Sequence, residues 1–126
     1  MNIPENLLYS SDHEWVRIES ERAVIGITDY AQDALGDVVF VDLPDVGGAV
    51  TAGASITEVE STKSVSDIYA PIAGTIIDVN QDLSESPELL NEDPYGEGWI
   101  CAIEFADGSQ FPDLLTAEQY GALIEG

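Results

Sequence analysis

The sequence predicts a mostly β domain, a small barrel or sandwich of short strands with a short internal helix and a C-terminal helix. Brief apolar or alternating runs recur along the chain, and clusters rich in glycine, proline and aspartate separate them. The 126 residues suit one compact domain with a core. No linker or low-complexity tract divides the sequence, so we expect a single domain over 1–126.

The strand pattern is clearest where polar and apolar residues alternate. In the run 65–69, Val65, Asp67 and Tyr69 are expected on one face, and Ser66 and Ile68 on the other. Turn signals lie at 44–48, 71–74 and 93–96. The predicted strands are Trp15–Ile18, Ala23–Ile27, Val38–Leu43, Ser55–Glu60, Val65–Tyr69, Gly74–Val79 and Trp99–Phe105.

The internal helix is predicted from its end signals. Asp29 is expected as the N-cap, with Gln32 completing a capping box three residues later. Gly36 is a residue that ends helices and sets the C-terminal limit.

The C-terminal helix has a second capping box, formed by Thr116 and Gln119. Leu115 and Tyr120 occupy the two positions of a hydrophobic staple. The remaining apolar face is expected to consist of Leu123 and Ile124.

The charge balance is strongly acidic. Arg17, Arg22 and Lys63 are the only basic residues against 25 acids, which gives a formal charge of −22. Three cations cannot form a basic patch, so we expect no nucleic-acid partner and no anionic membrane partner. The acids are spread along the whole chain, and such a coat suits work at very high salt, where like charges are screened. We therefore expect a halophilic source; an acidic face for basic partners is the alternative.

Several other classes of protein are disfavoured. No apolar run approaches the ~20 residues that span a bilayer, and no signal-peptide pattern opens the chain, so a cytoplasmic location is expected. With only His13 and Cys101, a transition-metal site is not expected, and Cys101 is interpreted as a small buried hydrophobe. The sequence has neither a Gly-x-Ser-x-Gly elbow nor a phosphate-binding loop, so we expect no catalytic activity of its own.

Lys63 is the only lysine of the chain and lies between two predicted strands. Its small polar neighbours suit a hairpin tip, from which a side chain projects into solvent. An exposed amine on a rigid turn is a good acceptor for an activated acyl group. The residue count alone leaves open the alternative that one surface lysine has simply been retained.

Four blocks of the sequence resemble the glycine cleavage H-protein family, and together they span nearly the whole chain in the right order. The blocks are Tyr9 with His13–Val16, Gly26–Gln32 with Leu35–Val41, Glu60–Lys63 with Ser66–Pro71 and Gly74, and Pro87–Trp99.

The resemblance implies a barrel-sandwich hybrid fold of the lipoyl- and biotinyl-carrier type. It also implies lipoate in amide linkage on Lys63, on an exposed turn. Glu60, Gly47 and Gly74 occupy places that help the lipoate-attaching enzyme in lipoyl modules. Thr62 and Ser64–Val65 replace the small apolar residues that are commoner beside the lysine, a mild departure.

The partners implied by the resemblance are three enzymes of glycine catabolism. Glycine decarboxylase, which uses pyridoxal phosphate, loads an aminomethyl group onto the arm. An aminomethyltransferase passes the carbon to tetrahydrofolate, and dihydrolipoamide dehydrogenase, which uses FAD, reoxidises the dithiol. The carrier catalyses none of these steps, and we expect a monomer.

A cleft for the loaded arm is implied in the matched motifs. Glu14 and Asp67 are expected to receive its cationic amine by charge-assisted hydrogen bonds, unless they are simply surface charges. His13 could orient the same cleft, but a structural hydrogen bond that holds the first strand is the favoured interpretation.

Other carriers fit the sequence less well. A biotin carrier would have methionines beside its lysine, whereas the only methionine here is Met1. A lipoyl domain of a 2-oxo acid dehydrogenase complex, or a lipoyl-relay carrier, is the closer alternative. The dehydrogenase domain would lack the block around His13 and the block around Tyr95.

Overall fold

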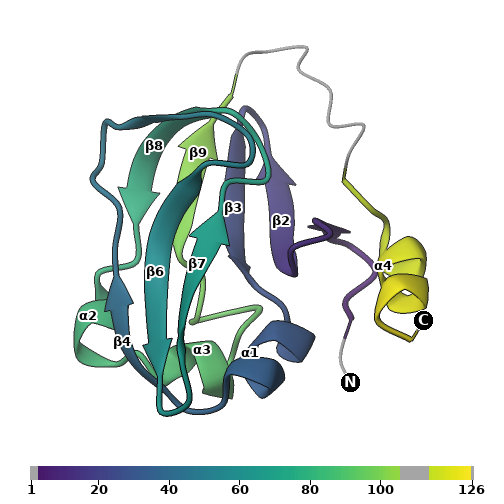
Figure 1. The fold of residues 1–126 in the computed structure, drawn as a ribbon. Helices are drawn as coiled ribbons and strands as arrows, with labels where there is room; N and C mark the ends of the chain where they lie inside the picture. Colours follow the sequence, from purple (N-terminus) through teal and green to yellow (C-terminus); the bar gives the residue numbers. More distant parts are fainter. Residues whose placement is uncertain (1–2, 106–113, 126) are drawn as a thin grey trace.

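The computed structural model describes residues 3–105 and 114–125, which form two antiparallel sheets and several short helices (Figure 1). In the larger sheet the strand order is β1-β2-β3-β9-β8-β5. Its strands are β1 (Leu8–Tyr9), β2 (Glu14–Glu19), β3 (Arg22–Ile27), β9 (Cys101–Glu104), β8 (Gly74–Val79) and β5 (Ala49–Val50). The predicted mostly β fold is confirmed.

The smaller sheet has three strands in the order β4-β6-β7. They are β4 (Val38–Asp42), β6 (Ser55–Ser61) and β7 (Val65–Tyr69). β6 and β7 form an antiparallel hairpin, and its turn lies at one end of the molecule beside α1 and α3 (Figure 1).

The main core joins buried side chains of both sheets. Val16 and Ile25 of the larger sheet belong to the same hydrophobic cluster as Val59 and Ile68 of the smaller one. Alternation along β7 is confirmed, because Ile68 is buried while its neighbours on the other face are exposed. Cys101 lies in this core, and burial raises the pKa of its thiol to about 12, in agreement with its interpretation as a small hydrophobe.

Helix α1 (Asp29–Leu35) forms where it was predicted, but its cap is displaced by one residue. Thr28, not Asp29, is the N-cap, and its hydroxyl accepts a hydrogen bond from the backbone N–H three residues later at 3.1 Å. The Asp29 carboxylate instead accepts a hydrogen bond from Gln32 Nε2 at 2.7 Å. Gly36 ends the helix as predicted, with a φ of +81°.

Helix α4 (Ala117–Glu125) has the predicted capping box. The Thr116 N–H donates to Gln119 Oε1 at 3.0 Å, and the Gln119 N–H donates to Thr116 Oγ1 at 3.2 Å. These bonds satisfy backbone donors that the first helical turn leaves free.

The apolar face of α4 is narrower than predicted. Tyr120 and Ile124, four residues apart, belong with Leu115 to a second hydrophobic cluster built around Tyr9 and Trp15. Leu123 is 47% exposed, so its predicted place on the packed face is wrong. A helix of nine residues packs only one stripe of side chains against the sheet, and Leu123 lies beside that stripe.

Four short elements have no predicted counterpart. The two-residue strands β1 and β5 are too short to show a period, and helices α2 (Asp82–Glu85) and α3 (Leu89–Glu92) have no side-chain cap hydrogen bond. Each helix is fixed by one buried leucine, Leu83 in α2 and Leu90 in α3.

Candidate functional site

The turn between β6 and β7, which we call the lysine turn, contains the only lysine of the sequence and is organised around the buried hydroxyl of Ser61. This hydroxyl accepts hydrogen bonds from the backbone N–H groups of Lys63 at 3.2 Å and Ser64 at 3.1 Å. The Ser61 N–H donates to the carbonyl of Ser64 at 2.8 Å and closes the turn. The Thr62 N–H donates to the carbonyl of Asp37 at 3.0 Å, which ties the turn to the loop before β4. The predicted hairpin tip is therefore confirmed and is held from two sides.

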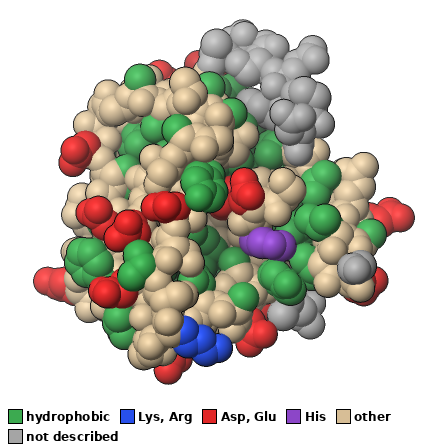
Figure 2. Space-filling view, in the orientation of Figure 1, with side chains coloured by type: hydrophobic (Ala, Val, Ile, Leu, Met, Phe, Trp, Pro, Cys, Tyr) green, Lys and Arg blue, Asp and Glu red, His purple; other side chains and the backbone are tan. Residues whose placement is uncertain are grey.

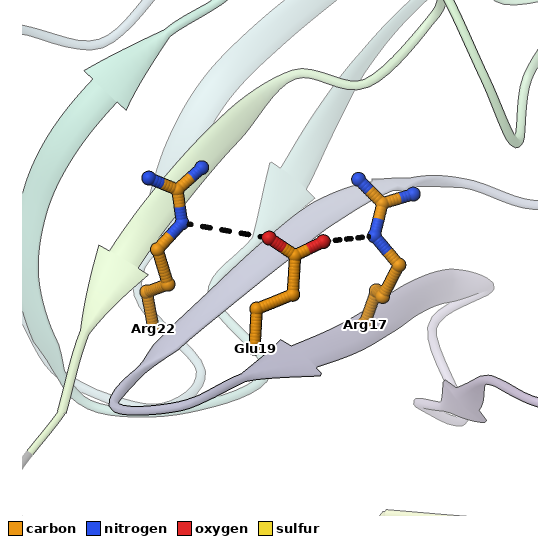
Figure 3. Close-up of polar contacts among 3 residues, drawn as sticks. All are labelled: Arg17, Glu19 and Arg22. Carbon is orange, nitrogen blue, oxygen red and sulfur yellow. Dashed lines mark hydrogen bonds and ion pairs between the residues drawn. The ribbon is translucent and has the colours of Figure 1, made fainter.

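The Lys63 side chain is exposed and lies across Gly36. A Cβ at Gly36 would lie 3.2 Å from Lys63 Cε, so the glycine leaves room for the stem of the lysine. Arg17 and Arg22 both pair with Glu19, at 2.6 and 3.9 Å (Figure 3). In the part of the chain that the structure describes, Lys63 is thus the one cation without an ion pair.

Beside the lysine turn, the outer face of the smaller sheet presents an apolar pair around a carboxylate. Phe40, Glu60 and Val65 are direct cross-strand neighbours on β4, β6 and β7. Phe40 is 53% and Val65 54% exposed, and Glu60 is exposed between them. Exposed apolar groups next to a single anchoring charge are typical of a protein contact.

The two glycines expected to assist lipoate attachment lie away from the lysine turn. Gly47 has a φ of +95°, and its N–H donates to the carbonyl of Ile76 in β8 at 2.7 Å. Gly74 is the first residue of β8, and a Cβ there would overlap the backbone oxygen of Glu104 in β9. β8 begins at the end of the molecule opposite the lysine turn (Figure 1). The structure thus gives both glycines a backbone role and does not bring them together with Lys63.

Glu14 is a buried carboxyl group at the start of β2. It is 1% exposed, and its Oε1 accepts a hydrogen bond from Ser10 Oγ at 2.7 Å, while Oε2 makes no hydrogen bond of standard geometry among the described residues. Burial, together with the charge of Asp12, raises the pKa of Glu14 to about 7, against the opposite effects of the Ser10 hydroxyl and of the Tyr69 backbone N–H. The carboxyl borders a pocket of about 250 Å³ whose other lining residues include Ser11, Asp12, Gly53, Ala70 and Pro71.

Asp67 lies on the exposed face of β7 and borders a different depression. Its Oδ1 accepts a hydrogen bond from Ser55 Oγ at 3.3 Å, and Asp42 and Glu58 line the same depression. The structure therefore does not place Asp67 in the pocket beside Glu14, although both residues come from the matched motifs.

His13, just before β2, makes a hydrogen bond and ring contacts with residues of α4 and α1. Its Nδ1 lies 2.8 Å from the hydroxyl of Tyr120, which also bonds Thr28 Oγ1 at 2.7 Å, and its ring packs on Tyr30. Burial lowers the pKa of His13, against the opposite effect of the charge on Asp12. These contacts join the start of β2 to α4 and to the cap of α1, as the structural interpretation expected.

Three residues that shape the site were not singled out from the sequence. They are Ser10 at Glu14, Ser61 in the lysine turn, and Asn91, whose side chain bonds the loop before β4. Serine and asparagine are common in loops, so their residue type alone gave no signal.

No group of His, Cys, Asp and Glu side chains in residues 3–105 and 114–125 is arranged to bind a metal ion. In the same ranges, none of the helices has the length and apolar character that crossing a membrane requires.

Comparisons with known proteins show to which family the chain belongs. A profile of the family described as glycine cleavage H-protein matches residues 7–126. The glycine cleavage system H protein of Bacteroides thetaiotaomicron is 51% identical over 126 residues and aligns over 100% of both chains. That of Bacillus subtilis is 52% identical over 125 residues, 99% of this chain and 98% of the relative. The crystal structure of a glycine cleavage system H protein from Mycobacterium marinum matches with a TM-score of 0.90 at 42% identity, over 98% of this chain and 100% of that one. This chain belongs to the glycine cleavage H-protein family.

Proposed function

We propose that Lys63 bears lipoate in amide linkage and that the chain carries the aminomethyl group of glycine on this arm. Family membership makes the chain a carrier component of the glycine cleavage system rather than a catalyst. The observation that supports Lys63 is its setting: it is the only lysine, exposed and free of ion pairs in the described residues, on a turn fixed by Ser61 and Thr62. Such a turn presents a nucleophilic amine without the entropy cost of ordering a loop.

The proposed partners are glycine decarboxylase, the aminomethyltransferase, dihydrolipoamide dehydrogenase and a lipoate-attaching enzyme, with the chain as a cytoplasmic monomer. When attached, lipoate supplies a disulfide that accepts the aminomethyl group and a dithiol that is later reoxidised. The part of this chain is to hold the attachment point rigidly, so that a tethered group reaches each active site at high effective concentration.

The Glu14 pocket has the chemistry to hold the amine of the aminomethyl cargo. The carboxyl is buried, and its Oε2 makes no hydrogen bond of standard geometry in the described residues. A buried carboxyl with a pKa of about 7 is easily ionised when a cation approaches, because the opposite charge lowers its pKa. The resulting charge-assisted hydrogen bond would keep the cargo out of water. Asp67, on the exposed face of β7, would add negative charge outside this pocket.

Glu14→Gln is expected to stabilise the empty carrier while weakening cargo retention. Burial raises the pKa of Glu14 from 4.5 to about 7, so the folded state favours the protonated carboxyl. Its contribution to stability is full below pH 4.5 and is lost as the pH rises through 7. Above pH 7 the glutamine variant should exceed the wild type by up to about 3 kcal/mol in free energy of unfolding, and below pH 4.5 the two should agree.

Urea unfolding of both proteins across this pH range measures the difference, and ammonia release from the loaded carrier alone measures retention. Glu104→Gln, which changes the same group at an exposed position of β9, is the control for the loss of one charge. A stability difference that does not depend on pH would contradict the buried titration, and unchanged ammonia release would contradict the retention role.

The proposed function is tested by intact mass after exposure to lipoate and a lipoate-attaching enzyme. One lipoyl mass should be added, and peptide mapping should locate it on Lys63. The loaded protein should then accept an aminomethyl group in the presence of glycine and glycine decarboxylase. A chain that folds but gains no lipoyl mass would contradict the proposal.

Glu60→Ala is expected to slow lipoylation without changing the fold. Glu60 is exposed between Phe40 and Val65 beside the lysine turn, where an attaching enzyme must dock. Loss of one charge-assisted contact of about 1.5 kcal/mol would lower kcat/KM roughly tenfold. Glu58→Ala, two residues earlier on the same exposed face, is the matched control. Equal rates for both variants would assign Glu60 no recognition role.

A further inference from the structure

We propose that Asn91 is a positioning residue for Lys63: its side-chain amide fixes the loop on which the lysine lies and so sets how the amine is presented to the attaching enzyme. The inference rests on the proposed function of Lys63 and adds a residue that is 28 positions away in the sequence. It follows from a continuous path of contacts between helix α3 and the lysine turn.

The first step is a pair of hydrogen bonds between Asn91 and the backbone on either side of Asp37, which we call the bracket. Asn91 Oδ1 accepts a hydrogen bond from the Val38 N–H at 2.8 Å, and Asn91 Nδ2 donates to the carbonyl of Gly36 at 2.8 Å. The same Nδ2 donates to Gln32 Oε1 at 3.1 Å in helix α1. One planar amide thus bonds the backbone on both sides of Asp37 and the last turns of α1.

The second step leads from this bracket to the lysine. The carbonyl of Asp37, in the centre of the bracket, accepts the hydrogen bond of the Thr62 N–H at 3.0 Å. The Lys63 stem lies across Gly36, where a Cβ would come within 3.2 Å of Cε. The loop that Asn91 fixes is therefore both the hydrogen-bond partner of the turn and the surface on which the lysine rests.

These contacts give Asn91 a role that packing alone does not explain. Gly36 has a φ of +81° at the end of α1, and as a glycine it leaves the backbone freer at this point than any other residue would. The Asn91 amide restricts this freedom and orients Asp37 for the turn. If the bracket loosens, the hairpin can remain folded through Ser61 while the base of the lysine shifts. A shift of this kind lowers the rate of an enzyme-catalysed transfer more than it lowers stability.

Asn91→Asp tests this role with almost no change in size. The variant retains an acceptor for the Val38 N–H but sets a carboxylate oxygen against the carbonyl of Gly36 and against Gln32 Oε1. Asn80→Asp is the matched control, because Asn80 Nδ2 donates to the carbonyls of Glu97 at 2.7 Å and Trp99 at 2.8 Å in another loop. Each variant loses the two hydrogen bonds that the amide Nδ2 donates, and each adds one negative charge.

Three measurements separate positioning from stability. The first is kcat/KM for enzymatic lipoylation. It should be at least tenfold lower for Asn91→Asp than for Asn80→Asp, because a displaced Lys63 amine is poorly placed for acyl transfer in the active site of the attaching enzyme. The second is the rate at which a small acylating reagent modifies Lys63, which should be similar in wild type and both variants. The third is hydrogen exchange of the Thr62 N–H, which should become faster in Asn91→Asp only.

The positioning role would be overturned if Asn91→Asp is lipoylated at the rate of Asn80→Asp, or if exchange at Thr62 is unchanged. Should Asn91→Asp fail to fold, Gln32→Ala removes one partner of the Asn91 amide, and unchanged exchange at Thr62 would then overturn the proposal. Failure of the wild type to accept lipoate would instead contradict the proposed function, and the exchange measurement would still decide the role of Asn91.

Discussion

Lys63→Arg is expected to abolish lipoylation, so that the intact mass stays unchanged after exposure to lipoate and an attaching enzyme. Acyl transfer needs an amine that can lose its proton, and a guanidinium stays protonated at any physiological pH. The sequence has no other lysine. The exchange conserves the charge at an exposed position without an ion pair in the described residues, so circular dichroism and the melting temperature should stay those of the wild type.

Adding Arg22→Lys to the Lys63→Arg variant gives a sharp control. Position 22 begins β3, directly after the β2–β3 turn, and its native side chain pairs with Glu19 at 3.9 Å (Figure 3). The double variant therefore has one lysine near a hairpin tip but lacks the surroundings of Lys63. No lipoyl mass is expected. A lipoyl mass on the double variant would mean that an exposed hairpin lysine is sufficient and that Glu60 and the loop before β4 are not needed.

Strands could be predicted where their two faces have different environments. β7 has one face in the core and one in solvent, so its alternating residues marked it clearly. β2 is harder, because Val16 packs in the main core and Trp15 in the second cluster, both without exposure. A strand buried on both faces loses its alternation, and this explains why the run around Trp15 alternates only loosely.

The displaced cap of α1 shows what local signals leave undecided. Thr28 and Asp29 are adjacent and both are good capping residues. The choice depends on a tertiary contact, because the Thr28 N–H donates to the carbonyl of His13 at 3.1 Å and keeps Thr28 extended. Asp29 is then the first residue that can turn into the helix.

Some features of the candidate site could likewise be predicted from the sequence, and others could not. Lys63 could be found from the sequence, since a lone lysine among 25 acids is unusual. The burial of Glu14 could not be predicted from the sequence, because only the fold distinguishes a buried acid from an exposed one. The bracket made by Asn91 joins residues more than 50 positions apart, and no local pattern encodes such a contact.

Stability is expected to rise steeply with potassium chloride. The two ion pairs of the described residues share Glu19, and acidic side chains are scattered over the face shown in Figure 2. On the smaller sheet, Asp42, Glu58 and Asp67 are direct cross-strand neighbours, a row of like charges that destabilises its sheet. Between about 0.1 M and 1 M salt the Debye length falls from about 10 Å to 3 Å, which removes most of this repulsion.

Thermal melts from low to multimolar salt measure the effect, and each kcal/mol recovered should raise the melting temperature by about 4 °C in a domain of this size. Glu58→Gln, at the centre of the acidic row, separates repulsion from general salt effects on apolar burial. The variant should melt above the wild type at low salt, and the two should converge as salt rises. A constant difference would mean that the row does not repel.

The response of aminomethyl transfer to salt then distinguishes two origins of the acidic coat. If the coat adapts the chain to high salt, screening removes long-range steering, and docking must depend on short contacts such as those of Phe40 and Val65 beside the lysine turn. Transfer should then persist at multimolar salt while the melting temperature climbs. If the coat instead attracts basic partner enzymes, transfer should weaken as salt rises, because steered association depends on unscreened charge. A flat melting curve would therefore reject the high-salt origin that the sequence predicts.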